Sequence, residues 1–158
     1  MTTAARQSLI KVIAGAGLLV GTLDILDAII FYGLRGVPAR RILQGIAFGL
    51  IGRTSYTLGM RSAALGLLLH FFIATTWAAI YLLASHRLPL SRHPWIYGTL
   101  YGILVYIVMN YIVLPLSHVG LRLLPPLVPL VNGVGALVVC IGLPLAFIAR
   151  RYISRHPA

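Results

Sequence analysis

The chain has 158 residues, of which 59% are hydrophobic and only 9% carry a charged side chain. Its mean hydropathy is +0.95. Soluble domains place charge on about a quarter of their residues, so this composition excludes an ordinary soluble globular domain. The sequence therefore predicts a protein whose surroundings are largely lipid.

Charge is strongly one-sided, because thirteen Lys and Arg residues face only two Asp and Glu, for a formal net charge of +11. The basic residues flank apolar runs, so we expect contact with anionic lipid headgroups and no nucleic-acid partner. The single cysteine, Cys140, excludes an intrachain disulfide framework and a Cys-rich metal site. No linker or shift in composition divides the sequence, which predicts one domain over 1–158.

The first apolar run follows Arg6 and Lys11, in the manner of a signal peptide. It continues to about Leu34, beyond the roughly 7–15 residues of a typical signal-peptide core, and no small-residue cleavage site ends it. We interpret it as a retained membrane span over 9–34. Within it lie Asp24 and Asp27, the only acidic residues of the chain. An ionisable group in the hydrocarbon costs about 2.5–3.5 kcal/mol, so both are candidate functional residues.

Three further apolar runs are long enough to cross a bilayer, which takes about 20 helical residues. We predict spans over 62–85, 94–117 and 128–148. Each must be a helix, because lipid offers no partners for backbone polar groups. We expect Pro115 and Pro144, which fall near span ends, to kink or end the helices. The fold class is therefore an all-α integral membrane protein with four transmembrane helices.

A shorter apolar segment, framed by arginines, separates the first two spans. We predict that 38–52 forms an interfacial helix in the headgroup region, with a re-entrant segment as the alternative. Arg40 and Arg41 next to it, and Arg150 and Arg151 at the end of the last span, are expected to reach lipid headgroups with their long side chains.

Polar residues recur on the faces of the predicted spans that carry small residues. Asp24 shares a face with Gly17 and Gly21, because these positions follow helical spacing, and paired glycines allow close helix contact. Gly98 and Gly102 form a second such pair in the third span. Small residues on one face are expected to point Asp24 into the bundle.

At a rise of 1.5 Å per residue, the polar residues of three spans lie about 10–15 Å below the membrane side that holds the first loop. A polar residue of the fourth span lies about 5 Å below it. Our hypothesis is a buried polar cluster that binds a proton or cation, or lines a polar passage. Its members are Asp24, Asp27, His70 and Asn110, with Asn132 as a cap.

Three members of the cluster also have other interpretations. Asp27 can pair with Arg53 or Arg61 and fix helix register. His70 can be a hydrogen-bonded packing residue, a proton-active group, or a metal or haem ligand. Asn110 can form a hydrogen bond between helices. The sequence leaves each of these interpretations open for Asp27, His70 and Asn110.

Motifs of known enzymes are missing from the sequence, which has no GxSxG, HExxH or P-loop pattern. We therefore predict neither an enzyme nor a cofactor or metal site. Seven basic residues fall on the side of the termini and six on the other side, so the positive-inside rule favours cytoplasmic termini by one residue.

The order of motifs in the last two-thirds of the chain resembles the YagU-like small bacterial inner-membrane proteins. The motifs are His70-Phe71-Phe72, Tyr97-Gly98-Thr99-Leu100-Tyr101-Gly102, Met109-Asn110, Leu114-Pro115-Leu116, Val131-Asn132-Gly133 and Arg150-Arg151. The resemblance implies an inner-membrane location, a His in the region of His70 and a Pro after the third span. It implies no particular activity, and the stretch with Asp24 and Asp27 has no counterpart in it.

Two functions follow from these observations. The first is a small ion- or proton-coupled transporter or channel that uses the polar cluster. The alternative is an accessory or structural protein that binds lipid or a membrane-protein partner, with the cluster serving only to fix packing. Four helices enclose little space, so we expect a passage to require a homo-oligomer or a partner.

Overall fold

The structure is a computed structural model that describes residues 3–120 and 125–155, and all regular structure within these ranges is helical. Four helical stretches are long and apolar enough to cross a membrane. They are Gln7–Gly33, Met60–Ser85, Pro94–Leu116 and Leu127–Ser154. The predicted all-α membrane fold with four spans is therefore confirmed, although the fourth helix continues beyond the predicted end of its span.

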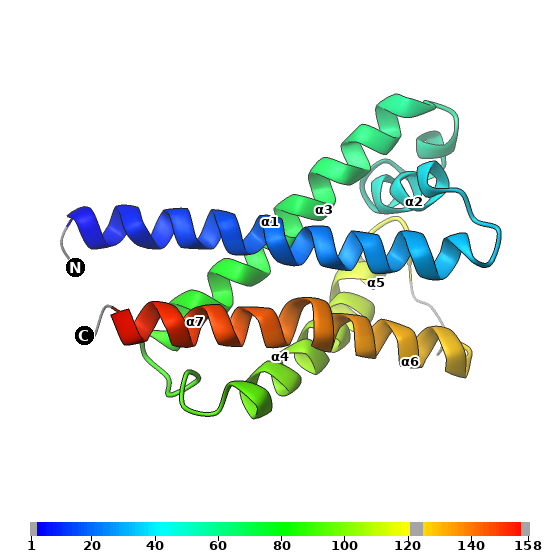
Figure 1. The fold of residues 1–158 in the computed structure, drawn as a ribbon. Helices are drawn as coiled ribbons and strands as arrows, with labels where there is room; N and C mark the ends of the chain where they lie inside the picture. Colours follow the sequence, from blue (N-terminus) through cyan, green and yellow to red (C-terminus); the bar gives the residue numbers. More distant parts are fainter. Residues whose placement is uncertain (1–2, 121–124, 156–158) are drawn as a thin grey trace.

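The first two spans are single helices, α1 (Thr3–Gly33) and α3 (Met60–Ser85). The third consists of α4 (Pro94–Val108), a π-helical stretch η2 (Met109–Val113) and α5 (Leu114–Leu116). The fourth consists of α6 (Leu127–Ala136), a π-helical stretch η3 (Leu137–Gly142) and α7 (Leu143–Arg155). The start of α1 and the end of α7 lie at the same end of the molecule (Figure 1).

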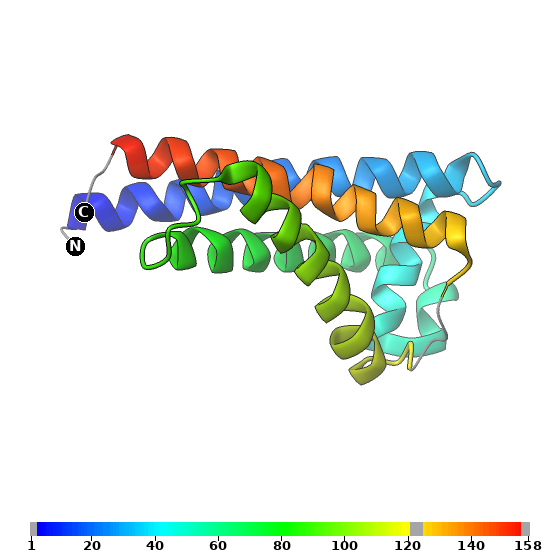
Figure 2. The same ribbon diagram turned by 90° about the horizontal axis from the view of Figure 1, so that it is seen from below.

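The spans are not parallel throughout. The first and fourth lie side by side along their length, with α3 crossing behind them (Figure 1). The third packs against the fourth through α4 and then diverges toward its C-terminal end (Figure 2). The core at these crossings contains fully buried Val20, Leu82, Val105 and Leu145. Outward-facing apolar side chains such as Phe72, which is 70% exposed, suit contact with lipid.

The segment after the first span forms the predicted short helix, α2 (Ala39–Ile51). It runs across the direction of α1, as expected for a helix in the headgroup plane (Figure 2). Gly66 of α3 lets the two helices meet at the backbone, because a side chain there would collide with the carbonyl of Leu43. Gln44, only 2% exposed, secures the contact by donating to the carbonyl of Gly59 at 2.9 Å.

Both glycine pairs lie at helix contacts. A Cβ added to Gly21 would come within 2.8 Å of the Phe71 ring of α3, and one added to Gly17 would collide with Thr75. A Cβ added to Gly102 would lie 2.5 Å from Cα of Val138 in η3. The absence of side chains at these positions therefore sets how closely the spans approach.

The two π-helical stretches each lead into a proline. Pro115 follows η2 closely and its helix ends at Leu116, as predicted. The expectation that Pro144 lies near the end of the fourth span is wrong, because the helix continues to Arg155. Proline lacks the N–H of a regular α-helical turn, and the wider π turn before it lets the helix continue.

Candidate functional site

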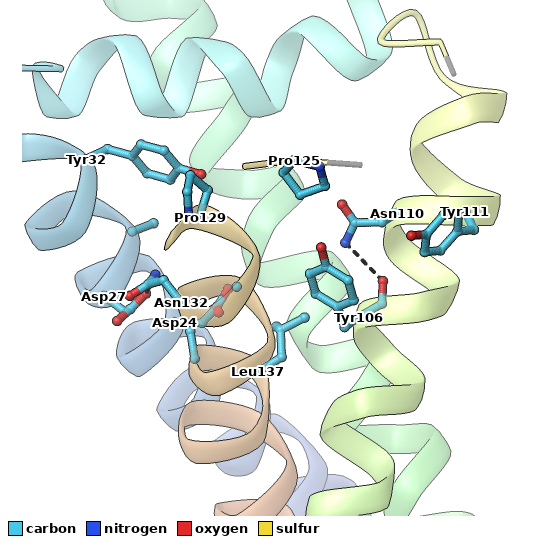
Figure 3. Close-up of a pocket in the computed structure, with 13 residues that line it drawn as sticks. Asp24, Asp27, Tyr32, Tyr106, Asn110, Tyr111, Pro125, Pro129, Asn132 and Leu137 are labelled. Carbon is cyan, nitrogen blue, oxygen red and sulfur yellow. Dashed lines mark hydrogen bonds between the residues drawn. The ribbon is translucent and has the colours of Figure 1, made fainter. Parts of the chain in front are cut away.

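A cavity of about 250 Å³ lies between the first, third and fourth spans. The first span lines it with Asp24 and Asp27, the third with Asn110, and the fourth with Asn132 (Figure 3). Four of the five predicted site residues thus lie around one space. The hydroxyl-bearing rings of Tyr32, Tyr106 and Tyr111 also line it.

Asp27 is held by the fourth span. The Asn132 amide donates to the Asp27 carboxylate, with 3.0 Å between Nδ2 and Oδ2. In the described part of the chain, neither Arg53 nor Arg61 pairs with Asp27, so the proposed arginine pair is wrong. Arg53 lies in the 3-10 helix Gly52–Tyr56 and Arg61 in the first turn of α3, whereas the partner of Asp27 comes from the fourth span.

Asn110 faces the cavity from the π-helical stretch of the third span. Its amide donates to the carbonyl of Tyr106, four residues earlier in the same span, at 3.0 Å (Figure 3). The interpretation of Asn110 as a hydrogen-bond donor between helices is therefore wrong. The third span diverges from the fourth toward its C-terminal end (Figure 2), and the hydrogen bond of Asn110 stays within its own span.

His70 lies in a second and larger cavity of about 720 Å³, between α2, α3 and the third span. Its Nε2 lies 2.7 Å from the carbonyl oxygen of Gly21, and a carbonyl only accepts, so Nε2 carries the proton. His70 therefore does not line the smaller cavity with Asp27, Asn110 and Asn132, but it shares the larger one with Asp24. Gly21 has no side chain to cover its carbonyl, so the His70 ring can reach α1 there.

Asp24 connects the two spaces, because it lines both cavities. Among the described residues, no hydrogen bond or ion pair to the Asp24 side chain is found. A partly buried carboxylate without a cationic partner is costly in a membrane, and such groups mark ion pathways or proton relays.

The polar side chains around the smaller cavity offer mainly oxygen atoms as ligands. Two carboxylates, two side-chain amides and several phenol hydroxyls surround it, which suits a proton or a hard cation better than a soft metal. In the part of the chain that the structure describes, no group of three or more His, Cys, Asp or Glu side chains is placed to hold a metal ion. The interpretation of His70 as a metal or haem ligand gains no second ligand from this arrangement.

Two residues have a place in the larger cavity that the sequence did not predict. Arg41, predicted only to reach lipid headgroups, lines this cavity, with its guanidinium carbon 4.0 Å from the centre of the Tyr56 ring. Gln44 fixes the helix that forms a wall of the same cavity. A signal for Gln44 was present, since it is the one uncharged polar side chain within the apolar segment 42–52. Nothing local distinguished Arg41 from Arg40.

The fold and the site together define a small all-α membrane protein with four spans and polar groups buried between them. No family model, no curated protein and no solved structure matches this chain.

Proposed function

We propose that this protein is a small ion-coupled membrane protein that binds a proton or small cation between Asp24 and Asp27 and passes it between its two cavities. The observation that supports the proposal is the position of Asp24, which forms part of the wall of both spaces. His70 on the far side of Asp24 is the next group able to take a proton.

The smaller cavity is suited to such a role by size as well as by chemistry. Its 250 Å³ holds several water molecules, because each occupies about 30 Å³. Water beside a carboxylate allows a cation to keep part of its hydration shell, and it carries protons along hydrogen bonds. Asp27 is already bonded to Asn132, so Asp24 is the carboxylate with free acceptor positions within the described chain.

The second candidate function is an accessory or structural role, and it has observations of its own. The Asn132–Asp27 bond joins α6 to α1, and the His70–Gly21 bond joins α3 to α1. Polar groups that only hold helices together would produce these same contacts. In that case the protein binds lipid or a membrane-protein partner and moves nothing.

A flux assay in liposomes separates the two functions. We expect the purified wild-type protein to release a proton or potassium gradient faster than empty vesicles, at one acidic and one neutral pH. Asp24→Asn removes the ionisable group at nearly constant volume, so its flux should fall to that of empty vesicles. Thr22→Ala, an exposed change on the same helix, should keep the wild-type rate.

Two results would count against ion coupling. If wild-type vesicles leak no faster than empty ones, the accessory function is favoured. If Asp24→Asn conducts at the wild-type rate, the carboxylate between the cavities has no role in flux. Circular dichroism and size-exclusion profiles of each variant establish that the helices are intact.

We place the protein in a bacterial inner membrane with both termini in the cytoplasm. Support comes from the resemblance to YagU-like proteins and from the one-residue excess of basic charge on the side of the termini. We also propose a homo-oligomer. The four spans of one chain enclose two cavities, and a passage through the whole membrane would need further helices around it.

A further inference from the structure

The larger cavity has the size and lining of a ligand site. Its 720 Å³ lies within the roughly 300–1,000 Å³ of small-molecule sites in proteins. Apolar side chains from three elements form most of the wall, in a region flanked by lipid-facing surfaces. Those from α2, α3 and the third span include Ile42, Ile46, Leu69, Ile73, Met109 and Val113. The apolar part of this wall suits a hydrocarbon chain, whereas Asp24 and His70 form a polar part of the same wall.

One end of this cavity carries an unpaired positive charge. Arg41 lies in the first turn of α2 and stacks on the Tyr56 ring, and within the described chain no carboxylate contacts it. Both acidic residues of the protein lie in the first span, so the chain supplies no other acid to Arg41. A planar guanidinium suits phosphate oxygens, which it binds with two parallel hydrogen bonds.

The larger cavity extends from Arg41 at one end to Asp24 at the other, and this depth suits an acyl chain that enters from the headgroup level. α2 follows directly on the loop after α1, whereas Asp24 lies nine residues before the last residue of α1, Gly33, which is about 14 Å along a helix. The segment after the third span borders the cavity beside α2, where the backbone N–H of His118 donates to the carbonyl of Gly49 at 3.0 Å.

We propose that the larger cavity binds one acyl chain of an anionic phospholipid of the surrounding bilayer, with Arg41 holding the headgroup phosphate. This inference does not rest on ion binding by Asp24, but Asp24 and His70 line the same cavity, so a bound acyl chain and an ion entering this cavity would compete for its inner end. It also distinguishes Arg41 from Arg40, because both side chains are exposed but only Arg41 lines the cavity.

The headgroup part of the proposal is tested by lipid retention in detergent, measured by native mass spectrometry. The purified protein is given phosphatidylglycerol and phosphatidylcholine with identical acyl chains. We expect about a fivefold preference for phosphatidylglycerol, since one basic residue near an anionic surface contributes about that factor. Arg41→Gln should abolish the preference, and Arg40→Gln, with the same charge change on the neighbouring residue, should retain it.

The acyl-chain part is tested by filling the cavity. A Cβ added to Gly45 meets only the Tyr56 hydroxyl, at 4.0 Å, and Gly45 lines the cavity, so we expect the side chain of Gly45→Leu to occupy part of this space. This variant should lose most of its bound phosphatidylglycerol. Gly15→Leu, at an exposed position of α1 with no neighbour within 4 Å, is the matched control and should retain it.

Either of two results overturns the proposal. Equal retention of both lipids by the wild type shows that Arg41 selects no headgroup. Unchanged retention by Gly45→Leu, with an unfolding temperature within error of the wild type, places the bound lipid outside the cavity. A Gly45→Leu protein that still selects phosphatidylglycerol at reduced occupancy supports both parts.

Discussion

The Asp27–Asn132 pair shows how single polar residues position the spans. Few contacts join α1 to α6 directly, and this hydrogen bond of 3.0 Å is one of them. In membranes such bonds between helices contribute about 0.6 kcal/mol on average and up to about 1.7 kcal/mol. The pair therefore fixes the rotation of two spans around the smaller cavity at a modest energy.

Exchanging the two residues tests this pairing. Asn132→Ala should lower the free energy of unfolding in detergent by about 1 kcal/mol, because Asp27 loses its donor. Asn132→Asp should lower it further, since two carboxylates then face each other. The double variant Asp27→Asn with Asn132→Asp restores one donor and one acceptor and should recover most of the loss.

Thr76→Ala serves as the control for these unfolding measurements. Thr76 is exposed and its hydroxyl bonds only to the carbonyl of Phe72 in the same helix, so its removal should have little effect. A double variant no more stable than Asn132→Asp alone would show that the side chains do not pair in the folded protein.

At the scale of elements, the crossing between α4 and η3 determines where the cavities form. Gly98 and Gly142 lie backbone against backbone, since a side chain on Gly142 would collide with the carbonyl of Gly98. Gly102 rests on the backbone of Val138 in the same way. Beyond this tight contact the third span diverges from the fourth, toward the end where both cavities lie (Figure 2).

Substituting a glycine at this crossing should separate the spans. Gly102→Ala places a Cβ 2.5 Å from Cα of Val138, and backbone atoms do not move as easily as side chains. We expect a loss of about 1–3 kcal/mol, as for other overpacked cores, measured by unfolding in detergent. Gly135→Ala, in the same span as η3 but with nothing within 4 Å, should leave stability unchanged. Equal stability of both variants would contradict the close crossing.

At the scale of the whole molecule, both ends of the described chain emerge at one end of the bundle, and α2 lies at the other (Figure 1). An even number of spans requires this arrangement if all four cross. It also places the loop end of α1, the larger cavity and Arg41 toward the same membrane surface.

Single cysteines introduced in place of Gln7, Ser154 and Thr54 test this topology, in a Cys140→Ser background. All three positions are exposed in the structure. A membrane-impermeant maleimide should label the first two from one side of the membrane and the third from the opposite side. Labelling of the Gln7 and Ser154 positions from opposite sides would exclude four crossings.

The sequence alone determined the number of spans and the short helix between the first two. Bilayer thickness sets the length of an apolar run, so runs bounded by arginines reveal the spans without any knowledge of packing. It also identified Asp24 as a buried polar group, because Gly17 and Gly21 on its face predicted a helix contact, which the structure confirms. These features depend on residues close together in the chain.

Only the tertiary structure decided which polar groups share a space. Helix periodicity predicts the face of a residue, but the partner of that face depends on crossing angles and on local changes in helical turn. The π-helical stretch at Met109–Val113 and the divergence of the third span left Asn110 bonded to its own helix. His70 lies in the other cavity, where its Nε2 donates to the carbonyl of Gly21, which no side chain covers. Contacts between distant segments set these outcomes. A depth estimated from a constant rise per residue carries no information about such contacts.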